Sequence, residues 1–318
     1  MFEHILVPLD GSSLAECVLP HVVAVARAFG SRVTLLQVLE RTRTPGLTRF
    51  VDPLGWYINE AESRAYLNKW ITRLQQAGLR VESTLLEGQA AERIIEFARD
   101  TDVGLIILSS HGRSGLSGWN VSSIVLKIIL RAYIPVMIVR AYQPATGDLT
   151  GLRYKELLVP LDCSQRAECA LPLATTLAHF HESELLVVHV VSRPQMPRRA
   201  PAAQEDIELA NRLVERNTQE ATRYLEQLQP RLNTDVQTRL IVSDHATAAL
   251  HDLVEQANVD LVVLSAHGYS GGTKWPYGSL VTNFIGYGTT PLLIVQDLSP
   301  EEVMRTKAEM SIRERKGH

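Results

Sequence analysis

The chain has 318 residues, of which 45% are hydrophobic and 21% are charged, and its formal net charge is −3. This length is enough for two globular domains, and the slightly acidic balance provides no general basic field that would attract nucleic acid. The most apolar long window, 121–139, is interrupted by Lys127, Arg131 and Pro135, so no membrane span is predicted. The first residues lead directly into an apolar run at 5–7 without the pattern of a signal peptide, and we therefore expect a cytoplasmic protein.

Short apolar and β-branched runs alternate with helical patterns through the first half of the chain. Strands are predicted near 4–9, 32–39, 80–86, 103–109 and 135–140. Helices are predicted between them, near 13–29, 59–77, 90–100 and 122–131. Because strands that alternate with helices form a parallel sheet covered on both faces, we expect an α/β domain with five parallel strands.

The first predicted helix, 13–29, carries signals at both ends. Ser13 and Glu16 have the spacing of a capping box, and Gly30 is a natural stop after the last turn. Pro20 falls inside this helix, where a proline would be expected to bend it.

The second half of the chain repeats the first. The strand and turn at 5–12 return at 157–164, and the last strand at 135–139 returns at 291–295. We therefore predict a tandem duplication. The predicted divisions are domain 1 at 1–141, a linker at 142–153, domain 2 at 154–297 and a C-terminal amphipathic helix at 298–318.

A glycine-containing loop follows the fourth predicted strand of each half. In the second half the loop Ser-Ala-His-Gly at 265–268 comes directly after the apolar run 261–264, and Gly278-Ser279 stands after a further nine residues. Glycine lets a ligand approach the backbone closely, and the start of a helix offers unpaired N–H groups with a partial positive charge. The pattern predicts a phosphate site. The loop at 109–112 is the first-half copy.

Acidic and histidine side chains stand at the same predicted strand ends. Asp10 and Asp162 each follow the first strand of a half, and ligands of parallel α/β sheets bind beyond the carboxyl ends of the strands. Two interpretations of these Asp residues stay open, namely ligand contact and capping of their own turn. His111 and His267 are interpreted as residues that fix the loop, because no oriented partner for a general base is evident.

Enzyme motifs are weak in this sequence. Ser270 lies in a Gly-x-Ser-x-Gly pattern typical of serine hydrolases, but it lies beyond the strand end and only Asp297 and His318 follow as triad candidates. Neither half contains a Walker phosphate loop. Arg113 and Lys274 are interpreted either as phosphate contacts or as solvated loop charges. We predict no catalytic residues.

The cysteines and histidines show no metal or redox pattern. Cys17, Cys163 and Cys169 lack the Cys-x-x-Cys spacing of a redox or zinc site, so we expect inert thiols in a reducing compartment. The histidines lack ligand spacing as well, and no metal site is predicted.

The motifs together resemble the universal stress protein family. They are the Val-Pro-Leu-Asp strand end, the Ser-x-His-Gly loop with its nine-residue gap to Gly-Ser, and the Pro-Val-x-Ile-Val last strand. The resemblance covers nearly all of 1–297, and the motifs occur in the same order twice. It implies two tandem Rossmann-like domains of the adenine nucleotide alpha hydrolase-like type, each a five-stranded parallel sheet sandwiched by helices. It also implies a sensor or regulator that binds ATP, or AMP or ADP, with Mg²⁺ accompanying ATP. Slow ATP hydrolysis stays open.

Binding residues follow from the resemblance position by position. Asp162 and the backbone of Val190 would face the adenosine, and the loop glycines with Ser279 would hold ribose and phosphates. The implied second-half set is Pro160, Asp162, Val190, Ser265, His267, Gly268, Gly278, Ser279 and Leu280. A weaker first-half set is Pro8, Asp10, Val38, Ser109, His111, Gly112, Ser122 and Ser123.

The chain departs from the family's ATP-binding pattern at three places. Ser109 and Ser265 stand where the pattern has its first glycine, and Ser122 stands where Gly278 keeps the third. Because Ser122 puts a Cβ and a hydroxyl where a phosphate would meet bare backbone, we expect the second half to bind more tightly. The other interpretation of Ser122 is a helix cap.

The resemblance also implies contacts between domains. The strands at 135–139 and 291–295 are expected at an interface between the two halves, in an intramolecular pseudo-dimer, because an apolar edge strand would otherwise aggregate. The helix at 298–318 is a candidate for joining two tandem chains into a homodimer. The loops 40–58 and 192–204 are interpreted as lids or as surface insertions. The alternative function is a stress protein that has lost nucleotide binding and acts through protein–protein interaction.

Overall fold

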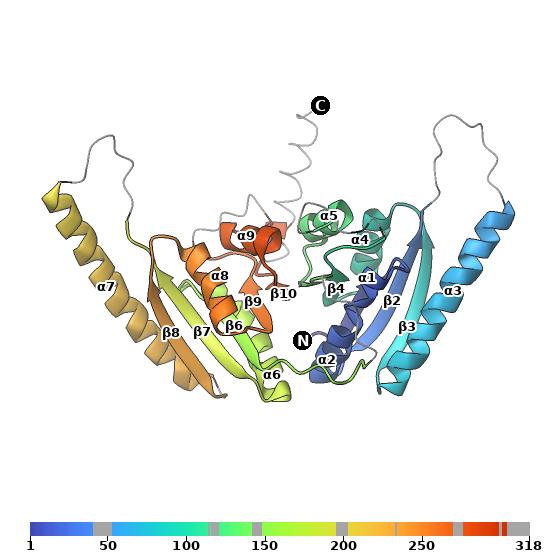
Figure 1. Cartoon of the computed structure of the whole chain (residues 1–318), viewed down its shortest axis with the longest axis horizontal. Coiled ribbons are helices and arrows are strands. Elements are labelled where there is room, and N and C mark those ends of the chain that lie inside the picture. Colours follow the sequence, from blue (N-terminus) through green and yellow to red (C-terminus); the bar gives the residue numbers. More distant parts are fainter. Residues whose placement is uncertain are drawn as a thin grey trace, which may run out of the picture. The chain divides into compact units, whose positions relative to one another are not determined.

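Each half of the chain is an α/β domain whose parallel strands alternate with helices (Figure 1). The computed structural model describes residues 1–40, 53–113, 115, 121–141, 148–194, 203–232, 234–269, 276–298 and 301–303. The chain divides into two compact units, one built mainly from Met1–Arg153 and the other mainly from Tyr154–Phe284. The predicted fold class, with two tandem domains, is confirmed.

The first half forms five parallel strands in the order β3-β2-β1-β4-β5. The strands are β1 His4–Pro8, β2 Arg32–Leu39, β3 Arg80–Glu87, β4 Leu105–Ser109 and β5 Val136–Val139. The helices are α1 Ser13–Glu16, α2 Leu19–Phe29, α3 Pro53–Gln76, α4 Ala90–Asp100 and α5 Ser123–Ala132. The chain moves outward from β1 to β3 and then returns to β4 on the other side of β1. A crevice is expected at such a switch point, beyond the carboxyl ends of β1 and β4.

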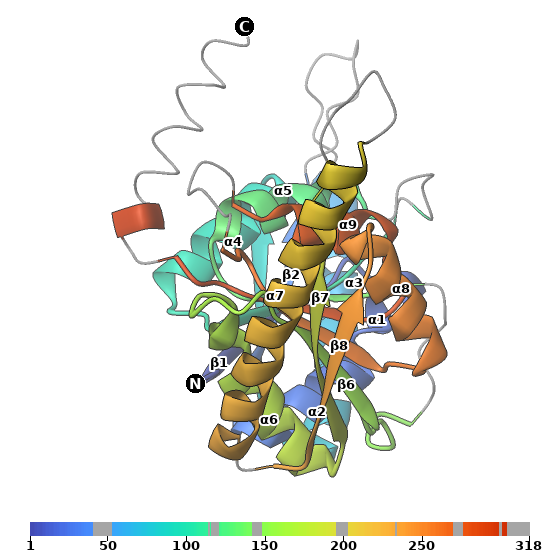
Figure 2. The ribbon, with the colours of Figure 1, turned by 90° about the vertical axis from the view of Figure 1, so that its left-hand side faces the viewer.

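The second half repeats this arrangement in the order β8-β7-β6-β9-β10. Its strands are β6 Glu156–Pro160, β7 Glu184–Val191, β8 Val236–Val242, β9 Leu261–Ser265 and β10 Leu292–Val295. Its helices are α6 Leu171–His181, α7 Gln204–Leu228, α8 Ala246–Gln256 and α9 Ser279–Tyr287, with short 3₁₀ helices at Ala167–Ala170 and Gln229–Arg231. Helix α7 lies along β7 and β8 (Figure 2), as α3 lies along β2 and β3. The switch point of this half lies between β6 and β9.

The last two strands of each half are completely buried. Every residue of β4, β5, β9 and β10 is buried, and each of these strands reads as a nearly continuous apolar run. The outer strands β3 and β8 are partly exposed and carry polar residues. The apolar composition of the buried strands is the reason why their positions could be predicted from the sequence.

The N-terminal cap of the first predicted helix was assigned to the wrong serine. Ser12, not Ser13, is the N-cap of α1, and its hydroxyl accepts the backbone N–H of Ala15 at 3.2 Å. The predicted stop at Gly30 is confirmed, because this residue has a φ of 66° in the left-handed region that glycine adopts readily.

The prediction of one continuous helix at 13–29 is also wrong, and the break explains the proline. Helix α1 ends at Glu16 and α2 begins at Leu19, so Pro20 lies in the first turn of a new helix. The N–H groups of a first turn have no acceptor within the helix, so a proline there costs no hydrogen bond, and its fixed φ is close to the helical value. Pro172 lies at the same place in α6.

Several other predictions fall partly outside the described residues. Helix α3 begins at Pro53, well before the predicted start at 59. Of the predicted C-terminal helix the structure describes Glu301–Val303, which are helical, and the rest lies outside the described residues, as do most of the two long loops. Within the described chain no helix is both long and apolar enough to cross a bilayer.

Stability is expected to fall on mild acidification because of His21 in α2. Burial lowers the pKa of His21 from the ordinary 6.5 to about 4. Between these values the unfolded chain holds a proton that the folded chain does not, so lowering the pH through this window favours unfolding. We expect His21 to account for a loss of about 2 kcal/mol in the free energy of unfolding between pH 7 and pH 4.5, measured by urea denaturation.

A His21→Gln variant provides the control for this pH dependence. Its free energy of unfolding should depend less steeply on pH over the same window. His4 remains in that variant and contributes in the same direction, because burial lowers its pKa too. An unchanged slope in the variant would show that His21 is not the group that takes up the proton.

Candidate functional site

The predicted binding residues lie at the carboxyl ends of the strands that flank each switch point. Pro8 and Pro160 end β1 and β6, and Ser109 and Ser265 end β4 and β9. Val38 and Val190 lie near the ends of the neighbouring strands β2 and β7. The helix-start residues are Ser122 and Ser123 at α5, and Gly278, Ser279 and Leu280 at α9. The topology thus brings the two predicted sets to one edge of each sheet.

Asp10 joins the loop after β1 to the loop after β4. Its Oδ1 accepts the backbone N–H of Ser12 at 3.0 Å and the Ser12 hydroxyl at 2.6 Å. Its Oδ2 accepts the backbone N–H of Arg113, which follows the loop glycine. The turn-capping interpretation therefore describes part of its role, and the contact with Arg113 adds a bridge across the switch point.

Asp162 makes the same contacts in the second half. Its Oδ1 accepts the backbone N–H of Ser164 at 3.1 Å and the Ser164 hydroxyl at 2.6 Å, and its Oδ2 accepts the backbone N–H of Tyr269. A carboxylate oxygen has more than one acceptor site, so these contacts leave room for a ligand donor. Ligand contact by Asp10 and Asp162 stays a prediction.

The loop glycines are required by these carboxylates. A Cβ on Gly112 would lie 2.1 Å from Asp10 Oδ2, and a Cβ on Gly268 would lie 2.1 Å from Asp162 Oδ2. Any side chain at either position would displace the carboxylate. The sequence pattern predicts these glycines from close approach of a ligand, whereas the distances show that close approach of the Asp carboxylate already favours them.

Gly278 is different, because the protein itself does not require a glycine there. A Cβ at this position would meet Ala266 O at 3.6 Å and His267 Cα at 3.8 Å, which are ordinary contacts. The two halves hold this position in the same way: the N–H of Ser122 donates to Ser110 O at 2.8 Å, and the N–H of Gly278 donates to Ala266 O at 2.8 Å.

The capping interpretation of Ser122 is confirmed. Ser122 is the N-cap of α5, and its hydroxyl accepts the backbone N–H of Val125 at 3.3 Å. Helices α5 and α9 thus begin directly beside the Ser-x-His-Gly loops. The partial positive charge of each helix N-terminus lies at the predicted phosphate position.

His267 has an oriented partner, which was not evident from the sequence. Its Nδ1 lies 2.8 Å from Asp297 Oδ1, and its backbone N–H donates to the same oxygen at 3.1 Å. Both side chains are buried, at 1% and 2% exposure. Asp297 Oδ2 lies 3.2 Å from Arg166 Nη1, and Arg166 Nη2 donates to Glu302 Oε1 at 2.6 Å. A chain of polar and charged groups therefore anchors the loop.

The first half anchors its loop with hydroxyl groups instead. His111 Nδ1 lies 3.1 Å from Ser110 Oγ, which accepts the backbone N–H of Ala141 at 3.1 Å. The Ser109 hydroxyl donates to Leu14 O at 2.9 Å. Because the side chains of His111 and His267 are buried, the geometry supports the interpretation that they fix the loop. Ser270 and Lys274 lie outside the described residues.

Thiols near the second-half site are not activated. Cys163 follows Asp162 with a φ of 64°, at the position that Gly11 holds in the first half. Burial and the Asp162 charge raise the pKa of Cys163 to about 11, and burial raises the pKa of Cys169 to about 11 as well. Both thiols therefore stay protonated at neutral pH, which fits the predicted inert thiols.

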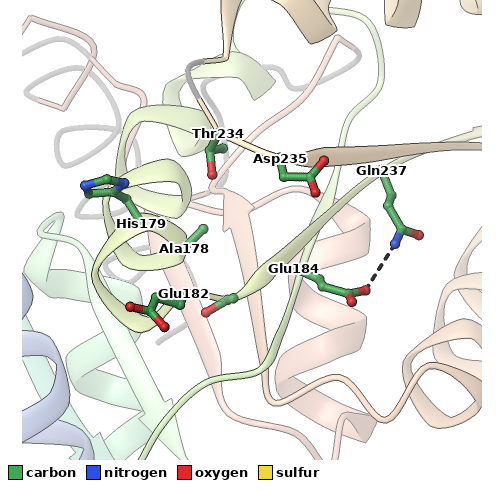
Figure 3. A pocket seen from close by; sticks show the side chains of 8 residues that line it. Ala178, His179, Glu182, Glu184, Thr234, Asp235 and Gln237 are labelled. Carbon is green, nitrogen blue, oxygen red and sulfur yellow. Dashed lines mark hydrogen bonds between the residues drawn. The ribbon is translucent and has the colours of Figure 1, made fainter.

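A hollow of about 500 Å³ lies at the opposite edge of the second-half sheet, near the amino ends of β7 and β8 (Figure 3). Its lining residues are Ala178, His179, Glu182, Ser183, Glu184, Thr234, Asp235 and Gln237. Glu184 accepts a hydrogen bond from the Gln237 amide at 3.1 Å. No predicted binding residue lines this hollow. Over the described part of the chain, no three or more His, Cys, Asp or Glu side chains gather as a metal ion would need.

Comparison with known proteins agrees with the duplicated geometry. The sequence model of the universal stress protein family matches residues 1–140 and 153–296. A universal stress protein of Methanocaldococcus jannaschii is 26% identical over 143 residues, which are 44% of this chain and 83% of that protein. One of Mycobacterium bovis is 25% identical over 225 residues, which are 69% of this chain and 70% of that protein.

A solved structure shares the fold over nearly the whole chain. The crystal structure of a universal stress protein from Archaeoglobus fulgidus superposes with a TM-score of 0.63 at 18% identity, covering 94% of this chain and 100% of that chain.

Proposed function

This chain belongs to the universal stress protein family as a tandem member with two family domains, and from that premise we propose that it binds ATP or a related adenine nucleotide as a stress-response sensor or regulator. The observation that carries the proposal is the Asp–loop contact at the switch point, which both halves build with the same atoms. It fixes the loop beside a helix N-terminus, where a phosphate group binds favourably.

The described residues fit an adenine nucleotide in the following way. The base would meet the backbone of Val38 or Val190 at the strand ends. The phosphates would meet the N–H groups and hydroxyls at the starts of α5 and α9, which include Ser123 and Ser279. In this proposal Mg²⁺ enters with the phosphates of ATP. Since the histidines of both loops are buried, the chain would hold the nucleotide and not turn it over rapidly.

The proposal is tested first by what the purified full chain carries. Heat denaturation should release adenine nucleotide into the supernatant, where chromatography identifies it. Calorimetric titration of nucleotide-free protein with ATP should then show two sites per chain. A protein that releases no nucleotide and gives no binding heat with ATP, ADP or AMP would instead support the alternative, a stress protein that acts through protein–protein interaction.

We expect the second-half site to bind ATP more tightly than the first-half site. Exchanging the residue at the helix start of each half should reverse this difference in affinity. Gly278→Ser is expected to weaken the second site about tenfold or more, because a side chain intrudes where a phosphate would meet backbone N–H groups and one charge-assisted hydrogen bond is lost. Ser122→Gly should strengthen the first site.

The exchange is interpretable because the protein tolerates a Cβ at position 278. The melting temperature of Gly278→Ser should therefore stay near that of the wild type, and the loss should appear only in titration with ATP. Unchanged affinity and stoichiometry in both variants would show that the helix starts do not hold the phosphates.

A further inference from the structure

Gln37 is a polar side chain inside an apolar strand. It lies near the carboxyl end of β2, between Leu36 and Val38, and is only 4% exposed. Its Oε1 is buried and has no hydrogen-bond partner among the residues that the structure describes. A buried polar atom without a partner destabilises the folded state, so we expect another group to supply the missing hydrogen bond.

The Gln37 amide lies close to the turn after β1 in the first half. Gly11, with a φ of +82°, directly follows Asp10, and the position of a Cβ on Gly11 serves as a reference point. Gln37 Nε2 lies 3.7 Å from that point, and Arg113 Nη2 lies 3.1 Å from it. The amide nitrogen and the Arg113 guanidinium therefore both lie close to the turn that follows Asp10.

The second half has no such amide. Its equivalent residue in β7 is His189, whose Nδ1 lies 2.8 Å from the carbonyl oxygen of Leu161. A carbonyl oxygen only accepts, so Nδ1 carries the proton and donates it. The imidazole is thereby held by the protein and retains a single acceptor nitrogen. At this position, near the carboxyl end of the second strand of each half, the first half therefore has an amide and the second half has an imidazole.

We propose that Gln37 reads the base of the nucleotide in the first half and selects a 6-aminopurine over a 6-oxopurine. This inference rests on the proposed nucleotide function, in which the neighbouring Val38 backbone faces the base. Whichever way it is turned, an amide presents one acceptor and one donor side by side, which match the N6 amine and N7 of adenine. A 6-oxopurine presents two acceptors on that edge, so the amide oxygen would face another oxygen. A single imidazole nitrogen in the second half offers no such pair.

The inference is tested by comparing ATP, ITP and 7-deaza-ATP in titrations of the full chain, with two sites resolved. ITP replaces the 6-amino group by an oxygen, and 7-deaza-ATP lacks N7. One of the two wild-type sites should prefer ATP to ITP by about tenfold to a hundredfold, as a bidentate contact to a base provides. At that site 7-deaza-ATP should bind with intermediate affinity.

Gln37→Leu should reduce the ATP preference of that site to about threefold or less. His189→Leu, the matched change in the second half, should leave the ATP preference of the first site unchanged. Persistence of the ATP preference in Gln37→Leu would overturn the inference.

A stability measurement separates base reading from a structural role. Leucine removes the amide, whose oxygen has no partner among the described residues, and keeps a side chain of similar size. The melting temperature of ligand-free Gln37→Leu should therefore equal or exceed that of the wild type. A lower melting temperature by several degrees would show that the amide holds the fold, and would count against the inference. A wild-type chain that binds none of the three nucleotides contradicts the proposed function itself. Binding without base preference contradicts only the role of Gln37.

Discussion

Gly268→Ala is expected to destabilise the second half and to weaken its nucleotide site. The new Cβ would lie 2.1 Å from Asp162 Oδ2, so the carboxylate must move and its hydrogen bond with the N–H of Tyr269 must break. The backbone at Gly268 is outside the left-handed region, so the clash alone decides the effect. We expect a loss of about 0.5–1.5 kcal/mol in the free energy of unfolding, the net contribution of one hydrogen bond, because Asp162 is exposed.

Urea denaturation and ATP titration of the full chain measure the two effects. Gly278→Ala is the matched control, because its Cβ meets only ordinary contacts and should leave stability within about 0.5 kcal/mol of the wild type. Gly112→Ala is expected to repeat the result in the first half, where the Cβ would lie 2.1 Å from Asp10 Oδ2. If Gly268→Ala and Gly278→Ala had the same free energy of unfolding, the close approach of the Asp162 carboxylate would not explain why residue 268 is a glycine.

Asp297→Ala is expected to have the largest effect on stability. The change removes the acceptor of both the ring and the backbone N–H of His267, and it deprives Arg166 of a partner. Leaving the ring and backbone N–H groups of buried His267 without their acceptor is expected to cost about 1–3 kcal/mol for each group, or about 2–6 kcal/mol together. In a domain of this size such a loss lowers the melting temperature by roughly 10 °C.

Two further variants assign the effect to the buried contact. Asp297→Asn keeps an acceptor oxygen in place and should recover part of the loss. Glu302→Gln alters the outer ion pair between Arg166 and Glu302, whose side chains are 31% and 26% exposed. This change should lower the free energy of unfolding by less than about 1 kcal/mol. If calorimetry gave Asp297→Ala and Glu302→Gln the same melting temperature, the His267–Asp297 contact would not stabilise the loop.

Local sequence pattern was sufficient for most of the secondary structure. Apolar β-branched runs are confirmed as buried parallel strands, because burial on both faces demands that composition wherever the strand lies. Helix α4 was predicted with its observed bounds, and Gly30 ends α2 as predicted. The two helices α1 and α2 were merged into one, because a proline in a first turn and a proline in a helix interior have the same local sequence.

The sequence by itself determined the duplication, the order of strands and helices, and the edge of the sheet at which the candidate residues gather, since all three follow from local pattern and from the rules of parallel α/β topology. Only the tertiary structure decided why those residues are there. The requirement for Gly268 depends on a carboxylate more than a hundred residues away in the chain, and the partner of His267 is thirty residues away. That Gln37 Oε1 has no partner among the described residues depends on how the neighbouring strands and loops pack. Distances between such residues are set by the packing of the sheet, which no local pattern encodes.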